Sequence, residues 1–259
     1  MGIANVAALI ACALAMGLGA LGAGLGLGNV ARASLRSMAR QPAKDPEFFR
    51  YMLVGQAITE TPAIFALVVS FLLYFAGGRA LEAPNSPAQS LMFLSAGLCM
   101  GIGALGSGIG SGLVAKEALE GMSRYPSSQG QLAILMMIGQ AWTQTGGIFA
   151  LVISLFMLNG GGFNQLSGAN DPLLWGSIPI SAGEILGIAR FAGAGIAMGF
   201  GAVGSSVGIA YIGCSACRSL ADVPEAGQRI KSAYFIGSAT AQSPSVFALI
   251  IALILLIRG

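Results

Sequence analysis

The chain has 259 residues, of which 55% are apolar and only 9% carry a charge, and it contains no histidine. Soluble domains carry about a quarter charged residues, so this composition excludes a soluble globular protein and predicts an integral membrane protein. The net charge of +3 indicates little about partners, and we expect no nucleic acid among them.

Apolar segments long enough to cross a bilayer occur in three pairs. Each pair has a glycine-rich segment, a short polar loop with a proline, and an aliphatic segment. About 20 apolar residues span the hydrocarbon core. We therefore predict six transmembrane helices, over residues 3–41, 46–77, 88–122, 129–159, 181–219 and 227–257.

The fold class that follows is an all-α membrane protein built from three tandem helical hairpins in one orientation. The first hairpin occupies residues 1–80 and carries a carboxylate. The second hairpin, at 81–160, and the third, at 181–259, have glutamine in its place. An outside linker at 161–180 joins the last two, and we expect the connection from Asn159 to Pro172 to be flexible.

Basic residues are concentrated near the three hairpin loops, which hold ten of the thirteen Lys and Arg residues. By the positive-inside rule these loops are cytoplasmic and both termini lie outside. Because no basic residue precedes the first apolar run, we expect no cleaved signal peptide. The ten residues are Arg32, Arg36, Arg40, Lys44, Arg50, Lys116, Arg124, Arg218, Arg229 and Lys231.

The first segment of each hairpin is rich in small residues. It reads GLGALGAGLGLG from Gly17, GIGALGSGIGSG from Gly101 and GFGAVGSSVGIA from Gly199. In lipid, small residues at such spacings let helix backbones come very close. Three aligned copies predict a tight inner circle of helices, and parallel copies of one unit favour assembly into a ring.

Glu60 is the only carboxylate deep inside an apolar segment. The surrounding VGQAITETPAIFALVV recurs 84 residues later around Gln144 and 182 residues later around Gln242. An ionisable group inside a bilayer is costly and is rarely present without a function. One charge in three copies of the frame predicts an ion site at Glu60, with Gln144 and Gln242 as its silenced equivalents.

The residues around Glu60 suggest ligands for this site. Pro62 lacks the N–H that would bond the Ile58 carbonyl, so we expect this carbonyl to accept a hydrogen bond from protonated Glu60. A simple helix kink is the alternative. The Thr61 hydroxyl and Gln56 are further candidates, although the Gln56 amide has an equally good use across a helix pair. Because desolvation disfavours the charged form of a carboxyl group, we expect Glu60 to hold its proton while it faces lipid.

Other polar groups indicate no second site. Glu117 and Glu120 lie near the loop end of the third segment beside basic residues, and we expect both to be solvated. Cys214 and Cys217 form a C-x-x-C without further metal ligands. We therefore expect no metal site, no catalytic residue and no cofactor.

The glycine helix, the loop Ala39-Arg40-Gln41-Pro42 and the Glu60 helix ending in IFALVV together resemble the c-type proteolipid of F-type rotary ATP synthases. The resemblance covers all three hairpins. It implies a non-catalytic rotor protein that forms a homo-oligomeric ring in the lipid of a bacterial-type inner (plasma) membrane. In that family the carboxylate takes an ion from one half-channel and releases it to another beside an arginine of the stator subunit a. The implied contact with the central-stalk subunits gamma and epsilon falls on Arg40, Gln41 and Pro42.

Hairpins that lack a carboxylate are similar to those of V-type ATPase proteolipids. The R-Q-P loop nevertheless favours an F-type rotor protein over a V-type one. Sodium-type relatives add a glutamine on the glycine helix, where this chain has Leu27, Ser111 and Ile209. They also have a tyrosine at Phe65 and a threonine at Pro62. We therefore expect protons, with sodium as the alternative, and a low ion-to-ATP ratio. A structural proteolipid and a small transporter remain competing classes.

Overall fold

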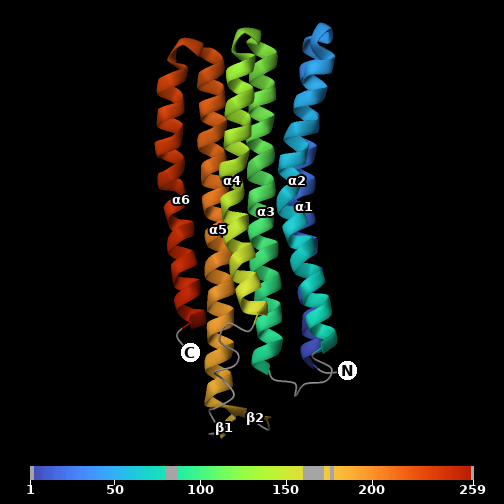
Figure 1. The fold of residues 1–259 in the computed structure, drawn as a ribbon, viewed down its shortest axis with the longest axis vertical. Helices are drawn as coiled ribbons and strands as arrows, with labels where there is room; N and C mark the ends of the chain where they lie inside the picture. Colours follow the sequence, from blue (N-terminus) through green and yellow to red (C-terminus); the bar gives the residue numbers. More distant parts are fainter. Residues whose placement is uncertain (1–2, 80–86, 160–171, 176–177, 258–259) are drawn as a thin grey trace.

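The computed structural model describes residues 3–79, 87–159, 172–175 and 178–257. Within these residues six long helices form three antiparallel pairs (Figure 1). All six are long and apolar enough to span a membrane. The predicted all-α fold of three hairpins is confirmed, and every helix bound lies within a few residues of its prediction. The pairs are α1 (Ile3–Arg40) with α2 (Asp45–Arg79), α3 (Pro87–Arg124) with α4 (Gln129–Leu158), and α5 (Ala182–Asp222) with α6 (Gly227–Ile257).

The three hairpin turns share one local structure and lie at the same end of the molecule, which we call the loop end (Figure 1). Gln41, Tyr125 and Val223 each precede a proline and are extended, with φ of −133°, −129° and −134°. A residue before proline is biased away from the helical region, so the first helix stops there. The proline then begins one 3₁₀ turn that runs into the second helix. These turns are η1 (Pro42–Lys44), η2 (Pro126–Ser128) and η4 (Pro224–Ala226).

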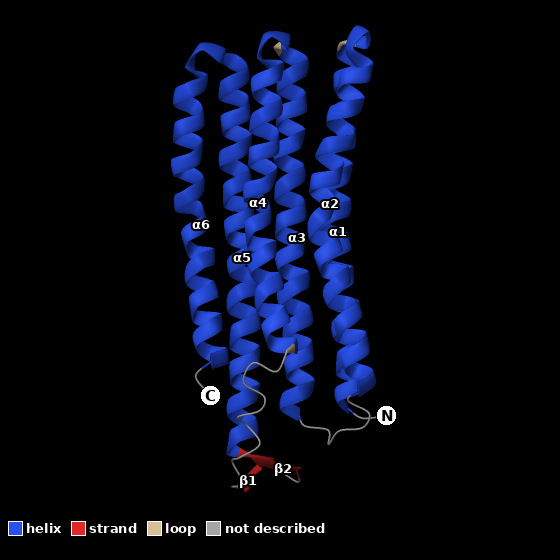
Figure 2. Ribbon diagram, viewed as in Figure 1, coloured by secondary structure: helices blue, strands red, loops and turns tan. Residues whose placement is uncertain are grey.

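Two short strands precede α5 at the end opposite the loop end (Figure 2). β1 (Pro172–Trp175) pairs antiparallel with β2 (Ile178–Ser181), with Pro172 opposite Ser181. These strands were not predicted, because runs of four residues are too short to show a periodicity. They lie at the end of the linker 161–180. The expected flexible connection from Asn159 to Pro172 falls almost entirely outside the described residues.

The glycine-rich helices α1, α3 and α5 pack side by side, with α3 in the middle, while α2, α4 and α6 lie along their outer side. We call the first three helices the glycine layer. A Cβ atom added at Gly22 would overlap the backbone of Leu105, and one added at Gly26 would overlap the backbone of Gly108. Only glycine permits this approach, and such close van der Waals packing contributes to helix association in lipid.

Alanine at Gly22 or Gly26 should therefore separate α1 from α3. Forcing an extra methyl into a packed interface costs roughly 1–3 kcal/mol, so we expect a lower midpoint of thermal unfolding in detergent, measured by circular dichroism. Gly130 is the matched control, because it is exposed and an added Cβ would meet no atom within 4 Å. An equal effect of Gly130→Ala would show that the close approach is not what stabilises the layer.

Candidate functional site

The three hairpins align at constant offsets. A residue of the first hairpin corresponds to the residue 84 positions later in the second and to the residue 182 positions later in the third. We call such residues counterparts. Glu60, Gln144 and Gln242 are counterparts on α2, α4 and α6. Gln144 and Gln242 are buried, with 7% and 8% of their surface exposed, whereas Glu60 is exposed in the single chain. The difference arises from what lies beside each residue.

Gln144 reaches back from the second hairpin to the first. Its Nε2 donates a hydrogen bond of 2.5 Å to the Ile58 carbonyl oxygen. Pro62 lies inside α2 and has no N–H, so the same carbonyl has no donor within its own helix. We expected this carbonyl to serve Glu60, and the structure places it against the silenced residue of the next hairpin.

The second junction has the same direction but uses different atoms. Thr145 Oγ1 lies 2.8 Å from Gln242 Oε1 and 2.8 Å from the Trp142 carbonyl oxygen. Gly146 replaces the proline here, because an added Cβ would overlap Ser206 Oγ and crowd the backbone of α5. The Nε2 of Gln242 is buried without a hydrogen-bond partner in the part of the chain that the structure describes. Both silenced glutamines therefore face the preceding hairpin.

Glu60 belongs to the first hairpin, so within one chain no preceding hairpin covers it. Thr61 donates to the Ala57 carbonyl at 3.4 Å. Its counterpart Thr145 faces the following hairpin, which indicates that Thr61 lies on the side of α2 toward the second hairpin. Gln56 is half-buried one turn before Glu60. The structure does not bring Ile58 or Thr61 to Glu60 within the chain, and it leaves Gln56 on the same helix as the carboxylate.

A buried polar cluster one turn from the silenced site was not predicted from the sequence. Gln140, the counterpart of Gln56, is fully buried, and its Nε2 donates to the Gly55 carbonyl at 2.9 Å and to Thr59 Oγ1 at 3.0 Å. The hydroxyls of Thr59 and Ser111 are 3.2 Å apart. The signal was present in the alignment of Gln140 with Gln56. The cluster joins the first two hairpins through neutral groups.

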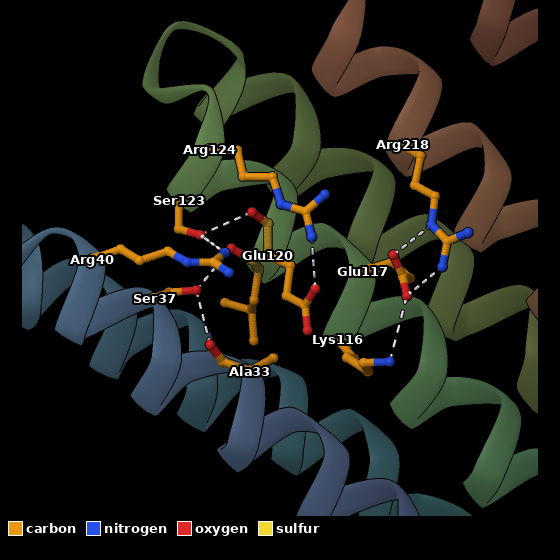
Figure 3. Close-up of polar contacts among 10 residues, drawn as sticks. Ala33, Ser37, Arg40, Lys116, Glu117, Glu120, Ser123, Arg124 and Arg218 are labelled. Carbon is orange, nitrogen blue, oxygen red and sulfur yellow. Dashed lines mark hydrogen bonds and ion pairs between the residues drawn. The ribbon is translucent and has the colours of Figure 1, made fainter.

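The loop residues expected to meet a central stalk lie at the tip of the first hairpin, and Pro42 begins η1 there. Arg40 Nη1 donates to Ser123 Oγ at 3.3 Å (Figure 3), and Gln41 Nε2 donates to the Ser123 carbonyl at 2.7 Å. Arg40 nevertheless remains exposed. Part of the loop chemistry thus fixes the second hairpin to the first.

Glu117 was expected to be solvated, and that prediction is wrong. It is 7% exposed, and its carboxylate accepts two hydrogen bonds from Arg218 of α5, at 2.7 and 2.8 Å (Figure 3). Lys116 Nζ lies 3.6 Å away on the other side. A bidentate arginine pair of this kind fixes geometry as well as charge. Glu120 is half-buried rather than solvated, and Arg124 lies 3.1 Å from its carboxylate.

Known proteins resemble each of the three hairpins. The ATP synthase C-subunit family matches residues 10–73, 94–157 and 192–255. The ATP synthase c-subunit of Geotalea uraniireducens is 40% identical over 78 residues, which is 30% of this chain and 86% of that protein. The second ATP synthase c-subunit of Pelobacter propionicus is 48% identical over 69 residues, 27% of this chain and 76% of that protein. The ATP synthase c-subunit of Geotalea daltonii is 45% identical over 69 residues, which is 27% of this chain and 76% of that protein.

The bond between Gln144 and the Ile58 carbonyl can be tested with a double-mutant cycle. Gln144→Leu leaves a buried carbonyl unpaired, which costs roughly 1–3 kcal/mol. Pro62→Ala restores a helical N–H to the same carbonyl, so we expect Gln144→Leu to destabilise much less in the Pro62→Ala background. The measurement is thermal unfolding in detergent. Purely additive effects would mean that the proline and the glutamine do not share one acceptor.

Proposed function

The chain belongs to the ATP synthase C-subunit family, and from this membership we propose that it is a rotor-ring proteolipid of a rotary ATP synthase. It is a multi-pass membrane protein that assembles with other ATP synthase subunits. It carries ions and catalyses no reaction itself, since formation or hydrolysis of ATP belongs to those other subunits. Three hairpins of the family are fused in one polypeptide.

The observation that supports ion carriage is which neighbouring hairpin each counterpart of Glu60 faces. Each silenced side chain faces the preceding hairpin, so Glu60 is directed toward the third hairpin of another copy in a ring. The counterpart of the Ile58 carbonyl there is the Thr240 carbonyl, which Pro244 deprives of its helical donor in the same way. The counterpart of the Thr145 hydroxyl is Ser243, which already lies 2.8 Å from that carbonyl oxygen.

Two groups of one copy thus complete the site of the next. When Glu60 is protonated, its O–H donates to the Thr240 carbonyl and the neutral pair faces lipid. A cationic residue on stator subunit a then favours the carboxylate and expels the proton. The Ile58 carbonyl serves the Gln144 junction of the same chain. Thr61 donates to Ala57 of its own helix, and Gln56 lies one turn from Glu60.

Protons are the proposed ion. Sodium needs several fixed oxygen ligands to replace its hydration shell. The glycine-layer position that would supply a further oxygen is Leu27 in the hairpin that bears Glu60. The corresponding Ser111 lies at the silenced junction, where it bonds Thr59 and Gln140. The carboxylate therefore has fewer oxygen partners than the neutral cluster between the first two hairpins.

One carboxylate serves three hairpins, so the ring moves few ions per turn. Each proton crossing the membrane gains about 2.3 kcal/mol per 100 mV. A low number of ions per ATP supplies less energy for synthesis, but it lets ATP hydrolysis build a steeper gradient. Gln144 and Gln242 cannot titrate, and they hold the other two junctions by hydrogen bonds. We infer a machine suited to ATP-driven pumping or to a high proton-motive force.

The basic residues of the hairpin loops support an orientation with the loop end in the cytoplasm and both termini outside, in a bacterial-type plasma membrane. The loop end then faces the central-stalk subunits gamma and epsilon. The exposed residue Arg40, with Gln41 and Pro42 beside it, is the proposed contact.

Carbodiimide modification of the assembled complex tests this function. We expect the reagent to modify Glu60, one site per chain, and to stop ATP-driven proton transport into vesicles. Glu60→Gln should remove both the labelling and the transport, because the neutral amide cannot titrate. Glu225→Gln, in the exposed turn η4, is the control and should retain both.

The same assay distinguishes the ion. Protection of Glu60 from carbodiimide by sodium at neutral pH would contradict the proton assignment. Undiminished transport by the Glu60→Gln complex would contradict the proposed carrier.

A further inference from the structure

The chain has two outer faces, one formed by α1 and α2 and the other by α5 and α6. Each has the features of one side of an internal hairpin junction but no hairpin packed against it. A Cβ added at Gly108 or Gly112 of α3 would overlap the backbone of α1, whereas their counterparts on α1, Gly24 and Gly28, have no atom within 4 Å. The opposite face behaves in the same way. Gly106 would meet the backbone of Val203, while its counterpart Gly204 on α5 is open. Backbone is therefore uncovered at glycine positions on both faces. A second copy of the chain can cover it, since the α5–α6 face of one copy matches the α1–α2 face of another.

The two internal junctions show which side chains meet at the loop end. In the first, Gln129 of α4 lies between Lys44 and Glu47, with Nε2 2.6 Å from the Glu47 carboxylate and Oε1 2.8 Å from Lys44 Nζ. In the second, Gly227 holds the position of Gln129, and a Cβ added there would overlap the side chain of Gln131, the counterpart of Glu47. The first residue of each outer helix therefore abuts one fixed position on the preceding hairpin.

At a junction between copies, the same two positions are held by opposite charges. The counterpart of Gln129 is Asp45 of the first hairpin, and the counterpart of Glu47 is Arg229 of the third. Both are exposed, and neither side chain makes a hydrogen bond or ion pair with any residue that the structure describes. Asp45 and Arg229 are thus free to pair across the junction.

A second complementary contact lies one turn away. Between the second and third hairpins a small cavity is lined by Glu117 and Arg124 on one side and by Arg218 and Asp222 on the other. At a junction between copies, the counterparts of Glu117 and Arg124 are Ser215 and Asp222, and the counterparts of Arg218 and Asp222 are Arg36 and Arg40. The single acid of the third hairpin at this level, Asp222, therefore lies beside Arg36 of the first hairpin, since Arg40 already bonds Ser123 of its own chain.

We propose that the face of α5 and α6 binds the face of α1 and α2 of a second copy through Arg229 against Asp45 and Asp222 against Arg36. This inference rests on the proposed ring. The junction between copies carries opposite charges both at Asp45 and Arg229 and at Arg36 and Asp222. Neither internal junction has opposite charges at both of these pairs of positions. The consequence is head-to-tail recognition of the third hairpin by the first hairpin of another whole chain, so every ring contains a multiple of three hairpins.

Cysteine pairs with a short bis-maleimide test the contact in the full-length protein in its membrane. We expect Asp45→Cys with Arg229→Cys to join separate chains, giving a ladder of covalent multimers in denaturing gels. The matched control is Glu47→Cys with Gln129→Cys, whose two positions meet inside one chain. That pair should react without any ladder, and the parent chain with its native cysteines should give none.

Charge reversal measures the strength of the contact. Arg229→Asp places two acids together and should lower the fraction of intact ring after heating in mild detergent, by about two- to fivefold for an exposed pair. Adding Asp45→Arg should restore it.

The proposal is overturned if the control pair reacts inside the chain while the Asp45 and Arg229 pair gives no ladder or joins a different polypeptide. Additive loss in the double reversal would overturn it as well. Normal carbodiimide labelling of Glu60 in such a ring would show that the junction assignment has failed and the rotor function has not.

Discussion

The hydrogen bond from Gln144 to the Ile58 carbonyl shows which side of the second hairpin faces the first. It exists because Pro62 removes the helical donor of that carbonyl, and because the residue at this position of each hairpin faces the hairpin before it. Repetition of that direction places Gln242 against Thr145. It also leaves Glu60, the first of the three, on an open face. In the proposed ring, the one carboxylate among the three counterparts is therefore the one whose partners come from another copy.

Packing in the glycine layer makes this arrangement possible. Gly22 and Gly26 bring α1 against the backbone of α3, so that side chains on the outer helices can bond between hairpins. The outer helices contain neutral hydrogen bonds near the middle of their length, and the charged contacts gather at the loop end, where Arg218 reaches Glu117. A buried carboxylate paired by arginine is expensive to uncouple, so the loop end fixes the register of α3 and α5.

The repeats, the six helices and the importance of Glu60 were predictable from the sequence, because offsets of 84 and 182 residues align every feature. The sequence did not predict which neighbouring hairpin each of these residues faces. Ile58 lies two residues from Glu60 in sequence, yet its carbonyl meets the second hairpin. The order in which the hairpins face one another depends on the handedness of the three-dimensional arrangement, which the sequence pattern does not show. Glu117 was misjudged because its partner Arg218 is on another hairpin. The strand pair β1–β2 was missed because its segments are too short to show a pattern.

The central claim is that one Glu60 per chain carries all the ions while two hairpins only complete the ring. The most direct test is the number of ions transported per revolution by the reconstituted complex, compared with the number of hairpins counted in images of its ring. We predict one ion for every three hairpins. One ion for every hairpin would contradict the claim, since it would require ion carriage at Gln144 and Gln242.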